Sequence, residues 1–145
     1  MGIVTADQIL SNNLQLAQMT PKTKNKLQKI FPKTVTVSNP LDLVGDADDK
    51  RYSVAIQNAI EDKNIDMIVV IVLFNTPAID EGIVKELGKQ KNKCKKPLIV
   101  ITIGSEYTQQ RIKDLENNGI VTFSYPNVAA RALWALSEYA RKNKN

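Results

Sequence analysis

The sequence of 145 residues contains no histidine and a single cysteine, Cys94. Without histidine, the chain lacks the commonest general base and the commonest metal ligand of proteins. One cysteine cannot form a disulfide within the chain, and no set of cysteines or spaced carboxylates has the pattern of a metal site. No carboxylates, lysines or serines are paired for catalysis either. We therefore expect no catalytic residue and no metal ligand in this chain.

A long apolar run and an amino-terminal signal pattern are also missing. No stretch of about 18 apolar residues occurs, so no segment is predicted to cross a membrane. The first residues do not show the basic-then-apolar order of a secretory signal. The 145 residues suffice for one domain with its own core. We expect a single domain, 1–145, located in the cytoplasm.

Basic residues outnumber acidic ones, and the formal net charge is +5. A basic chain raises the hypothesis of nucleic-acid binding. However, most lysines gather at 22–29 and 85–96, and no aromatic side chains alternate with them to stack on bases. Solvated helix faces account for such runs. We therefore expect no nucleic-acid partner.

Four segments have the patterns of strands. The runs 67–74 and 98–103 are short, apolar on both faces and rich in β-branched residues, which predicts central strands of a parallel sheet with helices on both sides. Alternation over 120–125 predicts an edge strand, and alternation over 14–19 predicts another short strand.

Amphipathic helices are predicted between these strands, over about 4–11, 21–31, 49–62, 78–91 and 105–118, with a last helix from Asn127. Thr20 is expected to cap the second of them, Asp46 or Asp48 the third, and Gly119 to end the fifth. The last helix is expected to bury one stripe of side chains: Val128, Ala132, Leu133, Leu136 and Tyr139. This alternation of strands and helices predicts a three-layer, doubly wound α/β domain with a parallel sheet.

The first predicted helix has no strand before it. In an open α/β sheet the first strand commonly lies in the middle. Its absence is expected to leave a gap between 14–19 and 67–74, with unpaired backbone groups along the gap.

Ligands in such folds bind where strands end and helices begin. The start of the first helix, at Gly2, offers unpaired amides and a favourable dipole to a phosphate, or it is an ordinary terminus capped by Thr5 or Asp7. The loop 38–47 either carries function or packs under its own side chains. The short loops 74–77 and 104–106 also lie at this edge, and we interpret Ser105 as an N-cap.

Several of these segments together resemble a known family. The residues that carry the resemblance are Gly2-Ile3-Val4-Thr5-Ala6-Asp7, then Asn39 to Ala47, then Arg51-Tyr52. They resemble the third α-side domain of NDP-forming acyl-CoA synthetases, a flavodoxin-like domain related to the carboxy-terminal domain of the succinyl-CoA synthetase β subunit. The 66–74 strand, the Lys96-Pro97-Leu98 strand entry and the Asn118-Gly119-Ile120-Val121 step fit the same template. The resemblance covers essentially the whole chain.

Members of this family convert acyl-CoA, phosphate and ADP to a free acid, CoA and ATP through a phosphorylated histidine between two helix N-termini. The resemblance implies that one of these is the helix that begins at Gly2. The phosphate-binding residues would then be those whose amides open the helix: Gly2, Ile3, Val4 and Thr5, the last also with its hydroxyl. The adjoining loop would be shaped by Asn39, Asp42 and Asp46, with Asn39 as the polar contact.

The sequence departs from the family pattern in two ways. Family members place a strand ending in several glycines before this helix, and here only Met1 and Gly2 remain. The sequence also contains neither the histidine-bearing CoA-binding domain nor the ATP-grasp module. The resemblance therefore implies a non-catalytic domain or subunit that binds no cofactor alone, with CoA and ATP or ADP with Mg bound by the assembled enzyme.

The expected partners are the histidine-bearing CoA-binding domain and the ATP-grasp subunit. A homodimer that covers the edges left by the missing strand is a further expectation. An alternative function is a regulatory or interaction module of an acyl-CoA synthetase-like protein acetyltransferase, without phosphoryl chemistry.

Overall fold

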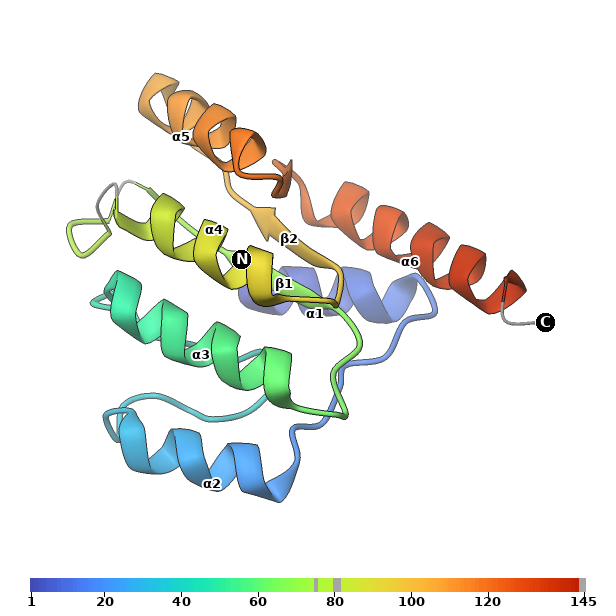
Figure 1. Ribbon diagram of the computed structural model, residues 1–145, viewed down its shortest axis with the longest axis horizontal. Coiled ribbons are helices and arrows are strands. Elements are labelled where there is room, and N and C mark those ends of the chain that lie inside the picture. The colour runs from blue at the N-terminus through green and yellow to red at the C-terminus, as the bar shows by residue number, and fades with distance from the viewer. Residues whose placement is uncertain (75, 80–81, 144–145) are drawn as a thin grey trace.

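The computed structural model of the chain describes residues 1–74, 76–79 and 82–143. Its elements follow in the order α1 (Gly2–Ser11), α2 (Pro21–Ile30), α3 (Asp49–Glu61), β1 (Ile68–Ile71), α4 (Gly82–Lys93), β2 (Leu98–Ile101), α5 (Glu106–Asn117), β3 (Val121–Phe123) and α6 (Pro126–Lys142) (Figure 1). None of the helices within these described residues is both long enough and apolar enough to cross a membrane.

The three strands form one parallel sheet in the order β1-β2-β3. All four residues of β2 are buried, since Leu98 and Val100 face one core cluster and Ile99 and Ile101 face another. This confirms the central strand predicted over 98–103, which the structure limits to Leu98–Ile101. The predicted edge strand near 120–125 is confirmed as β3, at one edge of the sheet.

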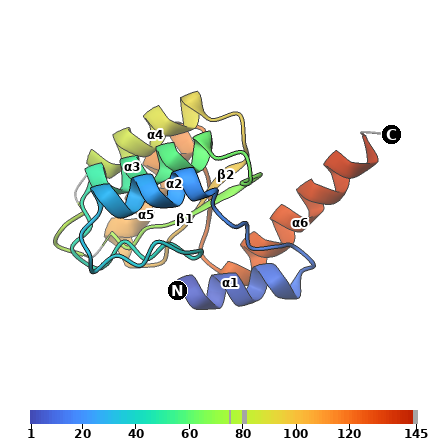
Figure 2. The ribbon, with the colours of Figure 1, turned by 90° about the horizontal axis from the view of Figure 1, so that it is seen from below.

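Helices cover both faces of the sheet. Helices α3, α4 and α5 pack on one face, and α1 and α6 cross the other (Figure 2). Helix α2 packs on the outer side of α3, where Leu27 and Ala55 belong to a smaller cluster with Val35 and Val37. The predicted three-layer α/β architecture with a parallel sheet is therefore confirmed.

Strand β1 lies at the other edge of the described sheet. Its residues alternate between buried (Ile68, Val70) and half-buried (Val69, Ile71). The prediction of a central strand over 67–74 is therefore wrong for the described residues. Its apolar sequence is that of a strand with neighbours on both sides, but a strand pairs with it on one side only.

The predicted strand over 14–19 is also wrong. Residues 14–20 belong to no strand or helix. Their backbone carbonyls accept hydrogen bonds from side chains and not from a neighbouring strand. The Asn39 side-chain amide donates to the Ala17 carbonyl at 3.0 Å, and that of Asn64 donates to the Gln18 carbonyl at 3.0 Å. Alternating side chains alone do not make a strand, because the backbone also needs a neighbouring strand to pair with.

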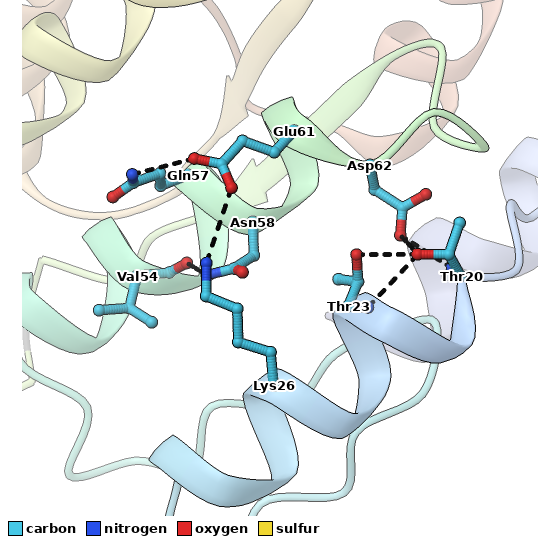
Figure 3. Close-up of polar contacts among 8 residues, drawn as sticks. All are labelled: Thr20, Thr23, Lys26, Val54, Gln57, Asn58, Glu61 and Asp62. Carbon is cyan, nitrogen blue, oxygen red and sulfur yellow. Dashed lines mark hydrogen bonds and ion pairs between the residues drawn. The ribbon is translucent and has the colours of Figure 1, made fainter.

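Helix α2 is attached to the end of α3 through Asp62, which is 2% exposed (Figure 3). The Asp62 carboxylate accepts hydrogen bonds from the Thr20 amide at 2.8 Å and the Thr20 hydroxyl at 3.0 Å. Thr20 also caps α2, as expected, because its hydroxyl oxygen accepts from the Thr23 amide. Burial raises the pKa of Asp62, but hydrogen bonds from Thr23, Asn64 and Thr20 outweigh it and hold the pKa at about 2.

Other helix ends follow the sequence closely. Asp48 caps α3 by accepting from the Arg51 amide at 2.8 Å, so the cap is Asp48 and not Asp46. Gly119 follows α5 with a φ of 73°, a conformation that glycine adopts without strain. Ser105 occupies the N-cap position of α5, although its side chain makes no capping hydrogen bond.

Helix α6 buries fewer side chains than predicted. Of the expected stripe, Leu133 is buried, whereas the other four side chains are exposed: Val128, Ala132, Leu136 and Tyr139. The buried positions are Ala129, Ala130 and Leu133, which pack on the sheet and α1. Figure 2 shows the reason, since the carboxy-terminal half of α6 extends beyond the sheet and has no layer beneath it.

Candidate functional site

The two segments singled out in the sequence line one cavity. Its volume is about 780 Å³, and its walls include the start of α1, the loop 38–45 and strand β1. The helix start and the loop are in close proximity, because a Cβ atom at Gly2 would lie 3.8 Å from Pro40 Cβ. The structure therefore brings Gly2 and Ile3 together with Asn39 and Asp42 at one site.

The start of α1 is an uncompensated positive helix end. The first intrahelical bond is donated by the Thr5 amide to the Met1 carbonyl at 2.9 Å, so the amides of Gly2, Ile3 and Val4 have no partner within the helix. No acidic residue lies in the first turn, and no side chain caps it. Such a helix end favours an anion through both its amides and its dipole.

Thr5 has a different role from the other three residues of the helix start. Its hydroxyl donates to the Met1 carbonyl at 3.0 Å, the same oxygen that its amide bonds, and the residue is 4% exposed. Both donors of Thr5 are therefore engaged inside the helix. Three free amides remain at the helix start, those of Gly2, Ile3 and Val4.

Each polar residue expected in the adjoining loop is engaged in shaping that loop. Asn39 donates to the Ala17 carbonyl, as described above. The Asp42 carboxylate accepts from the Val44 amide at 2.9 Å, and Val44 has a φ of 67°. Asp46 forms an ion pair with Arg51 at 2.6 Å, and the hydrogen bond from Arg51 holds the pKa of Asp46 below its usual value. Asp46 itself is not part of the cavity wall.

Arg51 and Tyr52 contribute to the site in ways that the sequence did not predict. The Arg51 guanidinium donates to the Leu43 carbonyl at 2.9 Å as well as to Asp46, so one side chain holds two points of the loop. The Tyr52 hydroxyl donates to the Ile71 carbonyl at 3.0 Å, and burial, followed by the negative charge of Asp42, raises the pKa of Tyr52. The sequence feature that pointed to Arg51 and Tyr52 was their position shortly after the loop, but position alone does not reveal contacts.

The two remaining loops contribute little to the cavity. Thr76 lies in its wall, and both the amide and the hydroxyl of Thr76 donate to the Leu73 carbonyl. Asn75, which belongs to the same predicted loop, lies outside the described residues. The loop 104–106 is not part of the wall. For the described ranges, no group of three or more acidic, cysteine or histidine side chains could hold a metal ion.

Replacing Arg51 by lysine is expected to loosen the loop while keeping the charge. Both hydrogen bonds leave one guanidinium nitrogen, Nη1. The lysine side chain is one bond shorter, so its ammonium does not reach the position of that nitrogen. The Ala47 amide of this loop donates to the Val44 carbonyl at 3.1 Å. Because the loop loses about 1 kcal/mol of stability, this amide is expected to exchange its hydrogen about five-fold faster. Amide exchange by NMR measures this.

The matched control for this substitution is Lys50→Arg, because Lys50 is exposed on the first turn of the same helix. Exchange at Ala47 is expected to be unchanged in that variant. Equal exchange rates at Ala47 in the wild type and in Arg51→Lys would show that the guanidinium does not hold the loop.

The fold and the position of the cavity place this chain in the class of doubly wound α/β domains, which bind ligands at the carboxyl edge of the sheet. The family is then identified by sequence. The model of the Ligase-CoA domain family matches residues 1–144, and the chain belongs to this family.

Relatives of known activity are ligases. The chain is 31% identical over 146 residues to the acetate–CoA ligase (ADP-forming) II subunit alpha of Pyrococcus furiosus, a match that covers 97% of this chain and 32% of that protein. It is 32% identical over 143 residues to the acetate–CoA ligase (ADP-forming) of Methanocaldococcus jannaschii, covering 96% of this chain and 20% of that protein. The chain thus spans a third or less of the length of these relatives.

Solved structures have the same fold. A protein of Pyrococcus horikoshii matches with a TM-score of 0.85 and 28% identity, over 97% of this chain and 33% of that one. The dinucleotide-forming acetyl-coenzyme A synthetase 1 of Candidatus Korarchaeum cryptofilum, solved in complex with phosphate and ADP, matches with a TM-score of 0.85 and 23% identity, over 97% of this chain and 31% of that one.

Proposed function

We propose that the chain is a non-catalytic domain or subunit of an ADP-forming acyl-CoA synthetase, and that its α1 N-terminus binds the phosphoryl group carried by a histidine of the assembled enzyme. The observation that carries this proposal is the set of three free amides at Gly2, Ile3 and Val4, of which the first two residues line a cavity shared with the loop 38–45, whereas Val4 is not in its wall. Membership of the Ligase-CoA domain family and the similarity to ADP-forming ligases support it.

The helix start suits the electrostatic part of phosphoryl transfer. Charge spreads over the phosphoryl oxygens in the transition state, and catalysis depends on positioning and on stabilising that charge. Backbone amides and a helix dipole supply fixed positive ends without a proton to exchange. In this proposal, Gly2, Ile3 and Val4 hold the phosphoryl oxygens, while Asp42 and Arg51 maintain the shape of the adjoining loop.

The remaining chemistry is assigned to the assembled enzyme. A histidine-bearing CoA-binding domain would supply the phosphorylated side chain, and an ATP-grasp subunit would bind ATP or ADP with Mg. The two relatives described above are both ADP-forming ligases, which favours this assignment over a regulatory module without phosphoryl chemistry.

Titration with inorganic phosphate is expected to shift the backbone amide signals of Ile3 and Val4 in NMR spectra, with weak affinity for the isolated chain. Gly2→Pro removes one amide but fits the first helical position, whose N–H has no partner in the helix. Because one hydrogen bond that contributes about 1 kcal/mol is lost, this variant is expected to bind phosphate about five-fold more weakly.

The matched control is Gly2→Ala, which keeps the amide and places its Cβ at an ordinary contact distance from Pro40. Its phosphate affinity is expected to equal that of the wild type. If phosphate leaves the Ile3 and Val4 signals of the wild type unshifted, the helix start does not bind the phosphoryl group.

A further inference from the structure

A second cavity lies at the amino ends of strands β2 and β3, and its volume is about 370 Å³. Its apolar wall consists of residues 97–99 at the start of β2, of Val121, the first residue of β3, and of Leu136 on α6. We call it the amino-end cavity. It shares no wall residue with the larger cavity, so it is separate from the candidate phosphate site.

The other side of the amino-end cavity is basic, because Lys91, Lys95 and Lys96 lie in its wall. The Lys96 ammonium donates to the Ala59 carbonyl at 3.1 Å and to the Asp62 carbonyl at 2.6 Å, so it is engaged at the end of α3. Over the described ranges, the ammonium groups of Lys91 and Lys95 form neither a hydrogen bond nor an ion pair. Two positive charges at the cavity are therefore open to a partner.

The positive charge of this region exceeds what the fold itself uses. Segment 89–96 contains five lysines and no acidic residue. Lysines at the end of a helix interact favourably with its dipole, which accounts for Lys91 and Lys93 in the last turn of α4. Lys95 lies beyond the helix and is exposed, so the dipole does not account for it. An excess of one charge beside an apolar wall suits a partner of the opposite charge.

An apolar stripe on α6 continues from the amino-end cavity. Val128, Ala132, Leu136 and Tyr139 are spaced by three or four residues and therefore share one face of the helix. All four are exposed, and Leu136 is also part of the cavity wall. Single exposed apolar residues are common on proteins, but a stripe that joins a cavity is typical of an interaction surface. We call these four residues the α6 stripe.

We propose that the amino-end cavity and the α6 stripe together bind an acidic, amphipathic helix of a partner protein. The stripe spans about three helical turns, or about 16 Å, from Val128 to Tyr139. A helix with an apolar residue at each turn matches this spacing, and such helices commonly bind through their apolar face. One apolar side chain of the partner enters the cavity, and acidic residues beside it pair with Lys91 and Lys95.

A second copy of this chain fits the surface poorly. Its helix with an exposed apolar stripe is α6, whose charged residues are Arg131, Glu138, Arg141 and Lys142. Glu138 already pairs with Arg141 at 2.7 Å, so α6 of a second copy would bring net positive charge to the lysines of the cavity. Like charges that face each other across an interface oppose binding, whereas an acidic partner avoids this repulsion.

The test uses the isotopically labelled chain and a synthetic peptide of about 15 residues, with leucines along one helical face and glutamates beside them. We expect this peptide to shift the amide signals of Val121 and Leu136 in NMR spectra and to become helical on binding. A matched peptide with lysines in place of the glutamates keeps the apolar face. It is expected to bind about ten-fold more weakly, because its charges repel Lys91 and Lys95.

Charge reversal on the chain provides an independent check. Lys95→Glu is expected to weaken binding of the glutamate peptide about ten-fold and to strengthen binding of the lysine peptide. The matched control is Lys93→Glu, because Lys93 is exposed on the same segment but lies outside the cavity wall. Its effect is expected to stay below about two-fold, since solvent and salt screen a charge that does not face the peptide.

The apolar half of the surface is tested with Leu136→Ala. This variant buries less apolar area against the peptide and is expected to bind it about ten-fold more weakly. Thermal denaturation of the same variant separates a loss of binding from a loss of folding.

Four outcomes would overturn the proposal. Equal binding of the glutamate and lysine peptides would show apolar adsorption only, and equal binding of a glutamate peptide with a central proline would show attraction without a helix. Shifts at Val121 and Leu136 that grow with protein concentration without peptide would show self-association. Equal or larger shifts with a short DNA duplex would show a nucleic-acid site. All of these results are read at Val121 and Leu136, so they are independent of the phosphate titration at Ile3 and Val4.

Discussion

Replacing Asp62 by asparagine is expected to lower the free energy of unfolding by about 1 to 2 kcal/mol at pH 7. The Asp62 carboxylate accepts the Thr20 amide and the Thr20 hydroxyl and thereby attaches α2 to the end of α3. Hydrogen bonds to a charged acceptor contribute more than neutral ones, and the asparagine side-chain oxygen remains as a neutral acceptor, which limits the loss. Urea denaturation followed by circular dichroism measures the difference.

The same substitution is expected to change how stability depends on pH. The pKa of Asp62 is about 2 in the folded chain, against an ordinary value of 3.8. A carboxyl group whose pKa is lower in the folded chain than in the unfolded chain stabilises the fold at pH values above its unfolded pKa. This stabilisation is lost as the pH falls through the folded pKa. The difference between wild type and Asp62→Asn is therefore expected to be constant above about pH 5 and to shrink from about pH 4 to pH 2.

The matched control is Glu61→Gln, at the neighbouring position. Glu61 forms an ion pair with Lys26 at 3.6 Å, and both side chains are about half exposed. Exposed pairs contribute little, so the change is expected to stay within about 0.5 kcal/mol. A difference between wild type and Asp62→Asn that persists unchanged at pH 2 would contradict the role given to the ionised carboxylate.

Replacing Leu87 by alanine is expected to lower the free energy of unfolding by about 3 kcal/mol, with a fall in Tm of about 10 °C. Leu87 lies on α4, is 0% exposed, and packs in the cluster that joins α4 to the sheet. Alanine is the best helix former, so the loss reflects the cavity and the lost contacts and not the helix itself. Thermal and urea denaturation both measure it.

Leu136→Ala is the matched control, because Leu136 lies on α6 and is 42% exposed. Its cost is expected to be below about 1 kcal/mol, since the residue is partly exposed and belongs to none of the three core clusters. Equal costs at the two positions would mean that the cluster around Leu87 is not the main core of the domain.

The candidate site was predictable in its location but not in its contacts. Gly2, Asn39 and Asp42 were selected from the sequence, and the structure places all three in the wall of one cavity. That both donors of Thr5 are engaged by the Met1 carbonyl was not predictable, because this depends on helix geometry at a single residue. The role of Arg51 was missed for a similar reason, since its bond to the Leu43 carbonyl requires the loop to fold back.

The sequence by itself determined the type of nearly every element. The β-branched run at 98–101 makes a strand buried on both faces, Thr20 starts a helix, and Gly119 ends one, because these signals act within a few residues. Local patterns of this kind are also enough to predict alternating strands and helices, and hence a layered α/β domain.

Only the tertiary structure decided which surfaces are covered. The apolar residues of β1 and α6 have the sequence of buried elements, yet Val69 is only half-buried, in the wall of the cavity, and Tyr139 is 69% exposed. Whether such a residue is buried depends on a neighbour that is distant in sequence or belongs to another chain, and no local pattern contains that neighbour. Burial and pairing are therefore properties of the assembled fold, whereas the tendency to form a strand or a helix belongs to the segment itself.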